Sequence, residues 1–250
     1  MAALWAWHLR LRNAAIVDVG WTALAGGLAI FYANTGGGAW TRRAAIGWMM
    51  GSWGARLTVY LLYDRVLGKP EDGRYAELRR SWSDRAGARF FWLFQAQAAA
   101  AVFFSVPALL ASVNPEPMLS SVELAACGLW IVAFAGETTA DRQLVRFKKH
   151  RENRGYTCRV GLWRYSRHPN YFFEWLTWIA YALFGSASPW GWLAFACPAA
   201  MLFLLCKLTG IPATEAQAIR SRGDEYREYQ RTTSAFVPWF PRGDAGRTLA

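Results

Sequence analysis

Residues 14–32 read AAIVDVGWTALAGGLAIFY, a nearly continuous apolar run about as long as the ~20 residues that an α-helix needs to cross a bilayer. Similar apolar stretches lie at 44–63, 90–111, 119–139, 171–185 and 189–206. The last two are joined by GSASP at 185–189, which is typical of a tight turn between antiparallel helices. The sequence therefore predicts an all-α integral membrane protein, a bundle of about six transmembrane helices (six to seven) in a single membrane domain.

The composition fits a membrane protein better than a soluble one. Of the 250 residues, 54% are hydrophobic and 15 are tryptophan, a side chain that gathers at membrane interfaces. The four cysteines have no metal-ligand spacing, so neither a disulfide framework nor a zinc site is expected. A formal charge of +11 would point to nucleic acid in a soluble protein, but basic loops are an ordinary topology signal in a membrane protein. No nucleic-acid partner is therefore expected.

The distribution of lysine and arginine predicts the topology. These residues gather before residue 14, at 64–89, at 140–170 and from 207 onward. The loops at 112–121 and 186–189 contain none. Because basic loops stay on the cytoplasmic side, both termini and the two long basic loops are expected there. Arg42 and Arg43 break the pattern and make the first hairpin the least secure part of this topology.

The tail is expected to lie on the cytoplasmic surface. Residues 214–229 are polar, with apolar and aromatic positions that could lie against the bundle or the membrane surface, which predicts a surface helix. The following FVPWFP at 236–241 is rich in aromatic residues and is expected to return to the membrane interface.

Five ionisable side chains fall within or at the ends of the apolar stretches, where a charge is costly unless it is paired or faces water: Asp18, Arg56, Glu137, Asp141 and Glu174. Three pairs stand four residues apart and so share a helical face: Arg56 with Tyr60, Glu137 with Asp141, and Asn170 with Glu174. This pattern favours one pocket that opens to the cytoplasm. The alternative is that the acids at helix ends simply reach water or pair with neighbouring arginines.

The segment GLWRYSRHPNYFFEW, residues 161–175, indicates an anion site. Pro169 suits the first turn of a helix, and Arg164, Arg167 and His168 come just before it. A helix amino terminus flanked by cations favours phosphate. The basic run RFKKHR at 146–151 could equally touch anionic lipid headgroups when taken alone. Together the two runs predict a large polyphosphate ligand such as a nucleotide cofactor.

Other cofactor and catalytic motifs are absent from the sequence. It has no Gly-x-Gly-x-x-Gly after a strand, no Walker loop and no Gly-x-Ser-x-Gly elbow. A dinucleotide would therefore have to be held by the helical bundle itself. His8, His150 and His168 do not share a helical face, so no metal site is expected.

The same residues carry a family resemblance. Residues 161–175, the preceding Glu137-x-x-x-Asp141-x-Gln143 with Lys148, and the closing Tyr226-x-x-Tyr229 through Phe236-x-Pro238 resemble the carboxy-terminal catalytic domain of the steroid 5α-reductase family. The likeness covers roughly the last half of the chain and is greatest to bacterial members of unassigned substrate. It implies substrate-side helices in 1–112, a cofactor-binding half in 113–250 and a location in the bacterial inner membrane.

The resemblance implies a membrane reductase that transfers hydride from NADPH to the C=C bond of a conjugated enone in a steroid-like or other lipid substrate. Asn170 and Glu174 fall where the family holds the nicotinamide, and Asp141 and Lys148 where it contacts the nucleotide. The expected cofactor-binding residues are Glu137, Asp141, Lys148, Arg164, Tyr165, Arg167, His168, Asn170, Tyr171 and Glu174. The expected partners are this lipid-soluble substrate and membrane lipid.

The resemblance also implies a catalytic acid on an earlier helix, where the family uses a Glu and a Tyr to polarise the enone carbonyl. Asp18 falls near the place of that Glu and is expected to stay protonated and donate to the enolate oxygen. An alignment through Arg56 puts Trp53 at the place of the family Tyr, which leaves Tyr60 as the nearest hydroxyl. Asp18, Tyr60 and Glu174 are thus the expected catalytic residues. The expected substrate contacts are Trp21, Trp53 and Arg56.

Two other functions remain open. Membrane methyltransferases of the isoprenylcysteine carboxyl or phospholipid type, which use S-adenosylmethionine, have a segment similar to RHPNY at 167–171 followed by a late acid, here Glu215. The full pattern from Asn170 to Glu174 and from Phe236 to Pro241 favours the reductase. The other alternative is a non-catalytic lipid-binding membrane protein that keeps the bundle without the chemistry.

Overall fold

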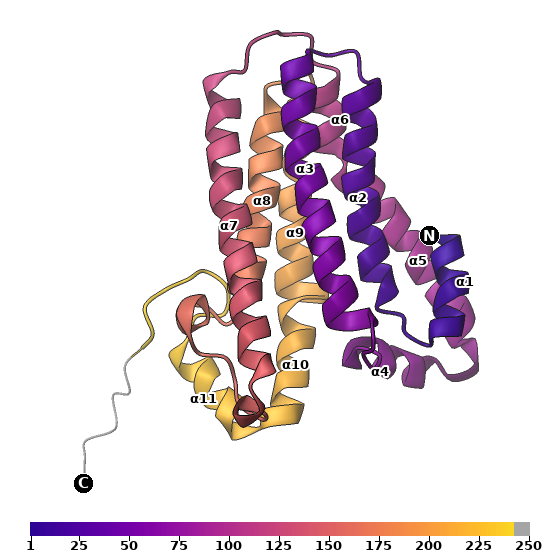
Figure 1. Ribbon diagram of the computed structural model, residues 1–250, viewed down its shortest axis with the longest axis vertical. Coiled ribbons are helices and arrows are strands. Elements are labelled where there is room, and N and C mark those ends of the chain that lie inside the picture. Colours follow the sequence, from indigo (N-terminus) through magenta and orange to yellow (C-terminus); the bar gives the residue numbers. More distant parts are fainter. Residues whose placement is uncertain (243–250) are drawn as a thin grey trace. The chain divides into compact units, whose positions relative to one another are not determined.

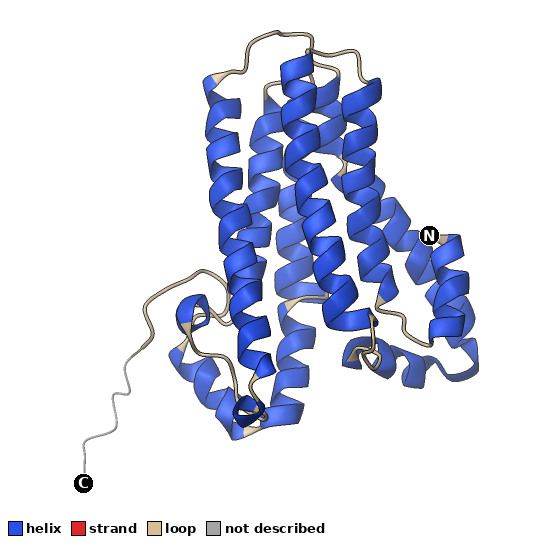
Figure 2. Cartoon of the chain, in the orientation of Figure 1, coloured by secondary structure: helices blue, strands red, loops and turns tan. Residues whose placement is uncertain are grey.

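The computed structural model describes residues 1–242, which form helices, turns and loops with no strand in that range (Figure 2). The predicted all-α class is confirmed. Four of the described segments are long and apolar enough to cross a membrane: Ile16–Thr35, Gly73–Ser112, Ser121–Lys149 and Gly191–Arg222. The other two predicted spans, 44–63 and 171–185, are also helical but fall short of that apolar character. These helices fit a multi-pass integral membrane protein.

Eleven α-helices are described, in this order: α1 Ala2–Leu11, α2 Ile16–Thr35, α3 Trp40–Leu61, α4 Gly73–Trp82, α5 Ala86–Phe104, α6 Val106–Ser112, α7 Ser121–Lys149, α8 Pro169–Ser186, α9 Ala196–Phe203, α10 Ile211–Arg222 and α11 Asp224–Thr232 (Figure 1). The expected surface helix at 214–229 is therefore two helices. The break falls at Gly223, whose φ of 59° lies in the left-handed region that glycine adopts without strain.

The described chain divides into two compact units. Unit 1 comprises Met1–Cys127 together with Tyr181–Cys197, and unit 2 comprises Gly128–Ala180 together with the chain from Pro198 onward. The end of α8 and the turn after it thus return to unit 1. Within that unit the Asn114 side chain donates to the Ala187 carbonyl at 3.0 Å and to Ser188 Oγ at 3.3 Å.

Helices α2 and α3 lie side by side in unit 1 and pack through small residues (Figure 1). A Cβ on Gly54 would lie only 2.9 Å from the Cα of Gly26 and 3.0 Å from the Thr22 carbonyl oxygen. The Thr22 and Thr58 hydroxyls hydrogen bond at 2.8 Å one turn away. Close backbone approach of this kind is a common way for membrane helices to associate.

One predicted span is broken in the structure. The stretch 90–111 was expected to form a single helix, but α5 ends at Phe104 and α6 begins at Val106. Pro107 stands in the first turn of α6, where its missing N–H leaves a carbonyl of the preceding turn without its helical donor. That carbonyl belongs to Phe103, four residues before Pro107, and the Cys197 thiol donates to it at 3.5 Å.

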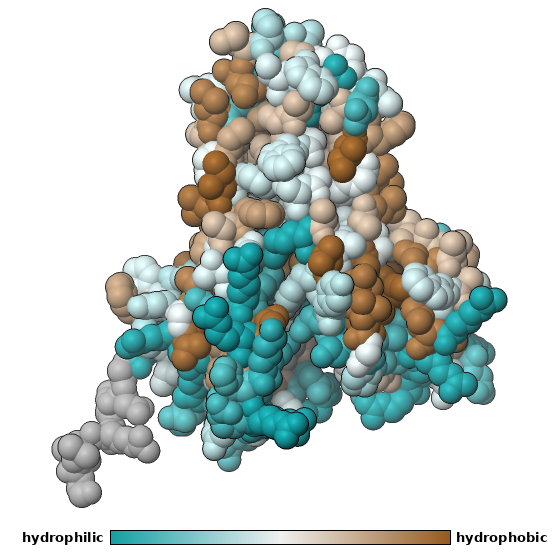
Figure 3. Space-filling model, viewed as in Figure 1, coloured by the Kyte–Doolittle hydropathy of each residue, from teal (hydrophilic) through white to brown (hydrophobic). Residues whose placement is uncertain are grey.

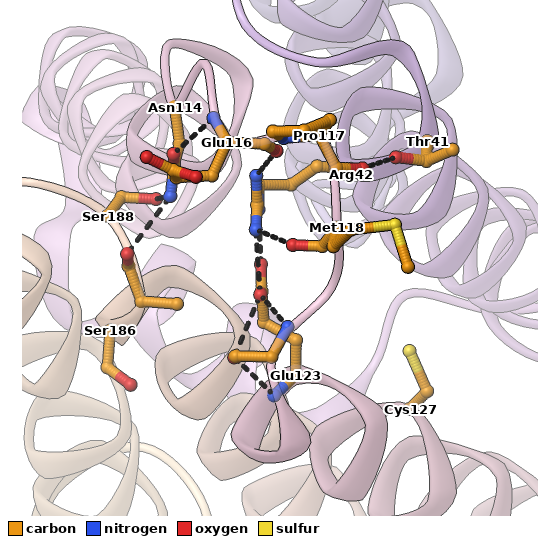
Figure 4. A network of polar contacts seen from close by, with 12 residues as sticks. Thr41, Arg42, Asn114, Glu116, Pro117, Met118, Glu123, Cys127, Ser186 and Ser188 are labelled. Atoms are coloured by element: carbon orange, nitrogen blue, oxygen red, sulfur yellow. Dashed lines mark hydrogen bonds and ion pairs between the residues drawn. The ribbon is translucent and has the colours of Figure 1, made fainter.

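A buried ion pair explains why Arg42 departs from the charge pattern. The Arg42 guanidinium, 2% exposed, makes a two-point contact with the Glu123 carboxylate, 0% exposed, with Nη2 to Oε2 at 2.9 Å (Figure 4). Arg42 also donates to the carbonyls of Glu116 and Met118, and Glu123 accepts from the Ser120 N–H at 2.8 Å. Arg42 is therefore neutralised inside unit 1, which removes it as evidence against the predicted orientation of the first hairpin.

In unit 2, α7 and α8 approach closely, since a Cβ on Gly136 would overlap the Phe173 ring. Along α7, Ile131 and Val132 are exposed in the apolar middle, whereas Lys148 and Lys149 are exposed at the end. The space-filling view shows this change from apolar to hydrophilic along α7 (Figure 3). The end of α7 is therefore hydrophilic and exposed, and it can contact water or charged groups.

Replacing Gly54 by alanine is expected to lower the free energy of unfolding by about 1–3 kcal/mol, because the added methyl group must push α2 and α3 apart. Thermal unfolding in detergent measures the effect. Gly27→Ala is the matched control, since no atom lies within 4 Å of its would-be Cβ, and it should be neutral or slightly stabilising. Equal melting temperatures for the two variants would contradict the tight helix crossing.

Replacing one member of the buried ion pair, in Arg42→Met or Glu123→Leu, is expected to cost about 3–5 kcal/mol, because each leaves the other charge buried without its partner. The double variant should recover much of that loss. A double-mutant cycle on the unfolding midpoint checks this, and additive losses from the two single variants would show that the pair does not act as a unit.

Candidate functional site

Acidic and amide side chains of α7 and α8 meet in unit 2. Glu137 and Asp141, one turn apart on α7, are both buried, and Asn170 Nδ2 at the start of α8 donates to Asp141 Oδ1 at 3.3 Å. Glu174, one turn further along α8, is buried and accepts from the Trp178 indole N–H at 2.8 Å. Of these groups, Asp141 and Asn170 are joined by a contact between the two helices, and the predicted shared pocket stays a prediction.

This cluster is rich in acceptors. The buried Oδ1 of Asn170 receives no hydrogen bond from the described residues, while the Nδ2 of the same amide is directed to Asp141. A buried acceptor without a donor is costly. The arrangement suits a ligand group that carries N–H or O–H donors.

The segment before α8 is held from α7. The Trp163 indole donates to the Ala140 carbonyl at 3.0 Å, and the Leu162 N–H donates to Gln143 Oε1 at 2.9 Å. Gly161 has a φ of 59°, and a Cβ there would overlap the Gln143 amide, so glycine is required for this approach. The predicted anion segment thus begins as a fixed turn packed on α7.

The tail after α11 holds the same segment from the other side. The Ser166 hydroxyl donates to the Phe236 carbonyl at 2.8 Å, and the Trp239 N–H donates to the Tyr165 carbonyl at 2.9 Å. The buried Tyr229 hydroxyl donates to the carbonyls of Trp163 and Ser166. The Tyr226-to-Pro238 region singled out from the sequence therefore shapes the segment before α8.

Arg167 and His168 make their contacts with the protein itself. Arg167 Nε donates to Glu215 Oε1 at 2.7 Å, and its Nη1 donates to the carbonyls of Gln230 and Thr233 at 2.9 and 2.6 Å. His168 Nε2 lies 3.3 Å from the same Glu215 oxygen. These contacts show Arg167 shaping the segment, and its predicted role in binding a phosphate stays a prediction.

The remaining predicted cofactor residues lie at or near the surface of unit 2. Lys148 and Arg164 are exposed, as is part of Tyr165. Tyr171 stacks on the His168 ring, with centroids 5.2 Å apart and planes at 6°, and its hydroxyl lies 3.3 Å from Thr214 Oγ1.

Asp18, in unit 1, has a different setting from the one expected. Its Oδ2 pairs with Arg65 Nη1 at 2.7 Å and Arg74 Nη2 at 3.3 Å, and its Oδ1 accepts from the Tyr75 hydroxyl at 2.6 Å. Both oxygens thus accept hydrogen bonds within unit 1. The catalytic role expected of Asp18 stays a prediction.

Tyr75 is the residue that sequence reasoning missed. It lies in α4, within the basic stretch 64–89 that was expected to be a loop, and it is buried. The signal that could have found it is Asp72, whose side chain caps α4 by accepting from the Arg74 N–H at 3.0 Å. An Asp followed by a helix-forming stretch predicts a helix start there, and hence an ordered Tyr75.

The predicted substrate residues lie in the packed interior of unit 1. Trp53 is fully buried, and its ring meets those of Trp21 and Tyr181 edge to face at 5.7 and 6.4 Å. Arg56 and Tyr60 follow on α3 and are half-buried. Roles for Trp21, Trp53, Arg56 and Tyr60 in substrate binding or catalysis stay predictions.

Metal binding has no support within residues 1–242, where no group of three or more His, Cys, Asp and Glu side chains is arranged to hold an ion. The family model described as protein of unknown function, DUF1295, matches residues 4–233. No curated protein and no solved structure matches the chain significantly. The match spans both units and includes the α7–α8 cluster, the segment before α8 and Asp18.

Proposed function

The chain belongs to the DUF1295 family, and from that premise we propose that it is a membrane-embedded reductase that uses NADPH to reduce the C=C bond of a conjugated enone in a steroid-like or other lipid substrate. The observation that carries the proposal is the buried, unpartnered Oδ1 of Asn170. The resemblance of residues 161–175 to steroid 5α-reductases supports the same conclusion. The proposed location is a bacterial inner membrane with both termini in the cytoplasm.

Asn170 and its neighbours fit a nicotinamide. The carboxamide of that ring carries an NH₂ donor, which matches the open acceptor of Asn170 and the carboxyl group of Glu174 one turn away. Asp141 fixes the Asn170 amide so that Oδ1, rather than Nδ2, is the open atom. When bound, NADPH would supply the hydride.

The exposed cations of unit 2 would hold the phosphates. Lys148 at the end of α7 and Arg164 before α8 can donate to phosphate oxygens, and Arg164 can do so in two-point fashion. The amino terminus of α8 adds its dipole to the same region. The proposed set is completed by residues that shape or line this region: Glu137, Tyr165, Arg167, His168 and Tyr171.

In unit 1, the resemblance implies Asp18 as the acid, and we add Tyr75, which it does not name, as a candidate phenol. Asp18 and its two arginine partners hold the Tyr75 hydroxyl group. The Tyr75 hydroxyl has one proton, which it donates to Asp18, so a role as donor to the enone carbonyl would require it to exchange this contact for the substrate oxygen. Tyr75 is thus a second candidate for the role expected of Tyr60.

One contact favours a second candidate, a methyltransferase that uses S-adenosylmethionine. Glu215, the late acid of that resemblance, directly contacts Arg167 and His168 of the RHPNY segment. The acceptor-rich α7–α8 cluster would also suit the ammonium group of that cofactor. The two functions therefore differ in which cofactor stabilises the protein.

NADPH is expected to raise the melting temperature of the purified protein in detergent, whereas S-adenosylmethionine should leave it unchanged. Asn170→Ala should weaken NADPH binding about tenfold or more, because the carboxamide loses its acceptor. Asn34→Ala is the matched control, since Asn34 is exposed and its side chain donates to the Ile30 carbonyl of its own helix. Stabilisation by S-adenosylmethionine alone would refute the reductase and support the methyltransferase.

Tyr75→Phe is expected to slow NADPH-dependent reduction of an enone panel by about 10²-fold or more while leaving NADPH affinity unchanged, because one donor to the enolate oxygen is lost. Absorbance at the NADPH band follows the rate. Tyr63→Phe, which removes an exposed hydroxyl, is the control. Full activity in the Tyr75 variant would exclude this phenol as the donor, and no turnover with any enone would favour the lipid-binding alternative.

A further inference from the structure

Glu215, in the second turn of α10, is the meeting point of three parts of unit 2. Its Oε1 accepts from Arg167 Nε at 2.7 Å and from His168 Nε2 at 3.3 Å, and its Oε2 accepts from Gln230 Nε2 at 2.6 Å. Arg167 and His168 immediately precede α8, and Gln230 belongs to α11. One carboxylate therefore joins α10, α11 and the segment that leads into α8.

These groups are largely withdrawn from water. The side chains of Arg167, His168 and Glu215 are 10%, 4% and 13% exposed. At this depth a charge-assisted contact is strong, and the loss of one partner leaves the others poorly satisfied. Glu215 is thus the group that fixes where the Arg167 and His168 side chains lie.

Arg167 also contacts the backbone of residues 230–234, at the end of α11 and just after it. Its Nη1 donates to the Gln230 and Thr233 carbonyls, and its backbone N–H donates to the Ser234 carbonyl at 2.8 Å. Asn170 lies three residues after Arg167, in the first turn of α8. Movement of the Arg167 side chain would therefore shift the backbone that carries Asn170.

Glu215 also fixes the state of His168. An Nε2–H that donates to the carboxylate leaves Nδ1 as the unprotonated nitrogen, and stacking on Tyr171 fixes the ring plane. Burial lowers the pKa of His168, and the Glu215 contact opposes that shift only in part. The imidazole is thus neutral at physiological pH.

We propose that Glu215 is a positioning residue for nucleotide binding: it holds the Arg167–His168 segment so that the start of α8 presents Asn170 in the binding geometry. This inference rests on the proposed function and adds to it a residue that touches neither substrate nor cofactor. A preorganised site loses affinity when its supporting shell loosens, even though every contacting residue is intact.

The test compares Glu215→Gln, which keeps the side-chain length and removes the charge, with Glu215→Asp, which keeps the charge and shortens the reach. Asp224→Asn is the control, since Asp224 is an exposed acid that pairs with Arg227 on its own helix. NADPH affinity is measured by titration at a temperature where each variant is folded. Glu215→Gln is expected to weaken binding about tenfold, with Asp224→Asn unchanged.

The histidines give a readout that needs no cofactor. The chain has only three, His8, His150 and His168, so imidazole nitrogen resonances can be resolved by NMR. Glu215→Gln should move the His168 Nε2 resonance and leave those of His8 and His150 in place. Glu215→Asp should give a smaller shift and a smaller loss of affinity.

The outcomes separate the two proposals. A Glu215→Gln variant that melts earlier but binds NADPH with wild-type affinity has lost only a structural contact, and the positioning role is then wrong. A His168 resonance that does not move in the Glu215→Gln variant would also contradict the positioning role. If the wild-type protein itself fails to bind NADPH, the proposed function fails, while the His168 resonance still decides whether Glu215 holds this segment.

Discussion

The cost of burying charge organises this protein. A lone charge withdrawn from water costs several kcal/mol, so each buried ion needs partners of opposite charge or strong donors. Arg42 meets Glu123, Asp18 meets Arg65 and Arg74, and Arg167 meets Glu215. Each of these contacts joins segments far apart in the sequence. The polar groups that an apolar chain can least easily bury are therefore the ones that fix its loops and helix ends.

The long apolar stretches could be predicted because a bilayer requires both length and hydrophobicity, and α2 and α7 lie where such stretches place them. The break at Ser105 was missed because hydropathy does not register the missing N–H of Pro107. Helix α4 was missed because its charged residues resemble a loop. Its stability comes from packing and from the contact between Tyr75 and Asp18, neither of which has a local signature.

Helical spacing made part of the candidate site predictable. Helical spacing placed Glu137 with Asp141 and Asn170 with Glu174, and the structure brings Asp141 to Asn170. The partner of Arg167 could not be read from spacing, because Glu215 lies 48 residues later on another helix. Pairing of Asp18 with arginines also depends on tertiary structure, which is why its partners could not be read from spacing. Local periodicity identifies faces, whereas partners across the fold depend on packing.

The hydrogen bonds that fix the segment before α8 have a consequence for biosynthesis. The Arg167 side chain donates hydrogen bonds to Glu215 in α10 and to the carbonyls of Gln230 and Thr233. The Ser166 hydroxyl donates to the Phe236 carbonyl. All of these groups leave the ribosome long after α7 and α8 have been translated. The nascent chain can insert its early helices into the bilayer, but it cannot complete these contacts until Phe236 has been translated. Products that stop before that residue therefore carry the helices without the finished segment before α8.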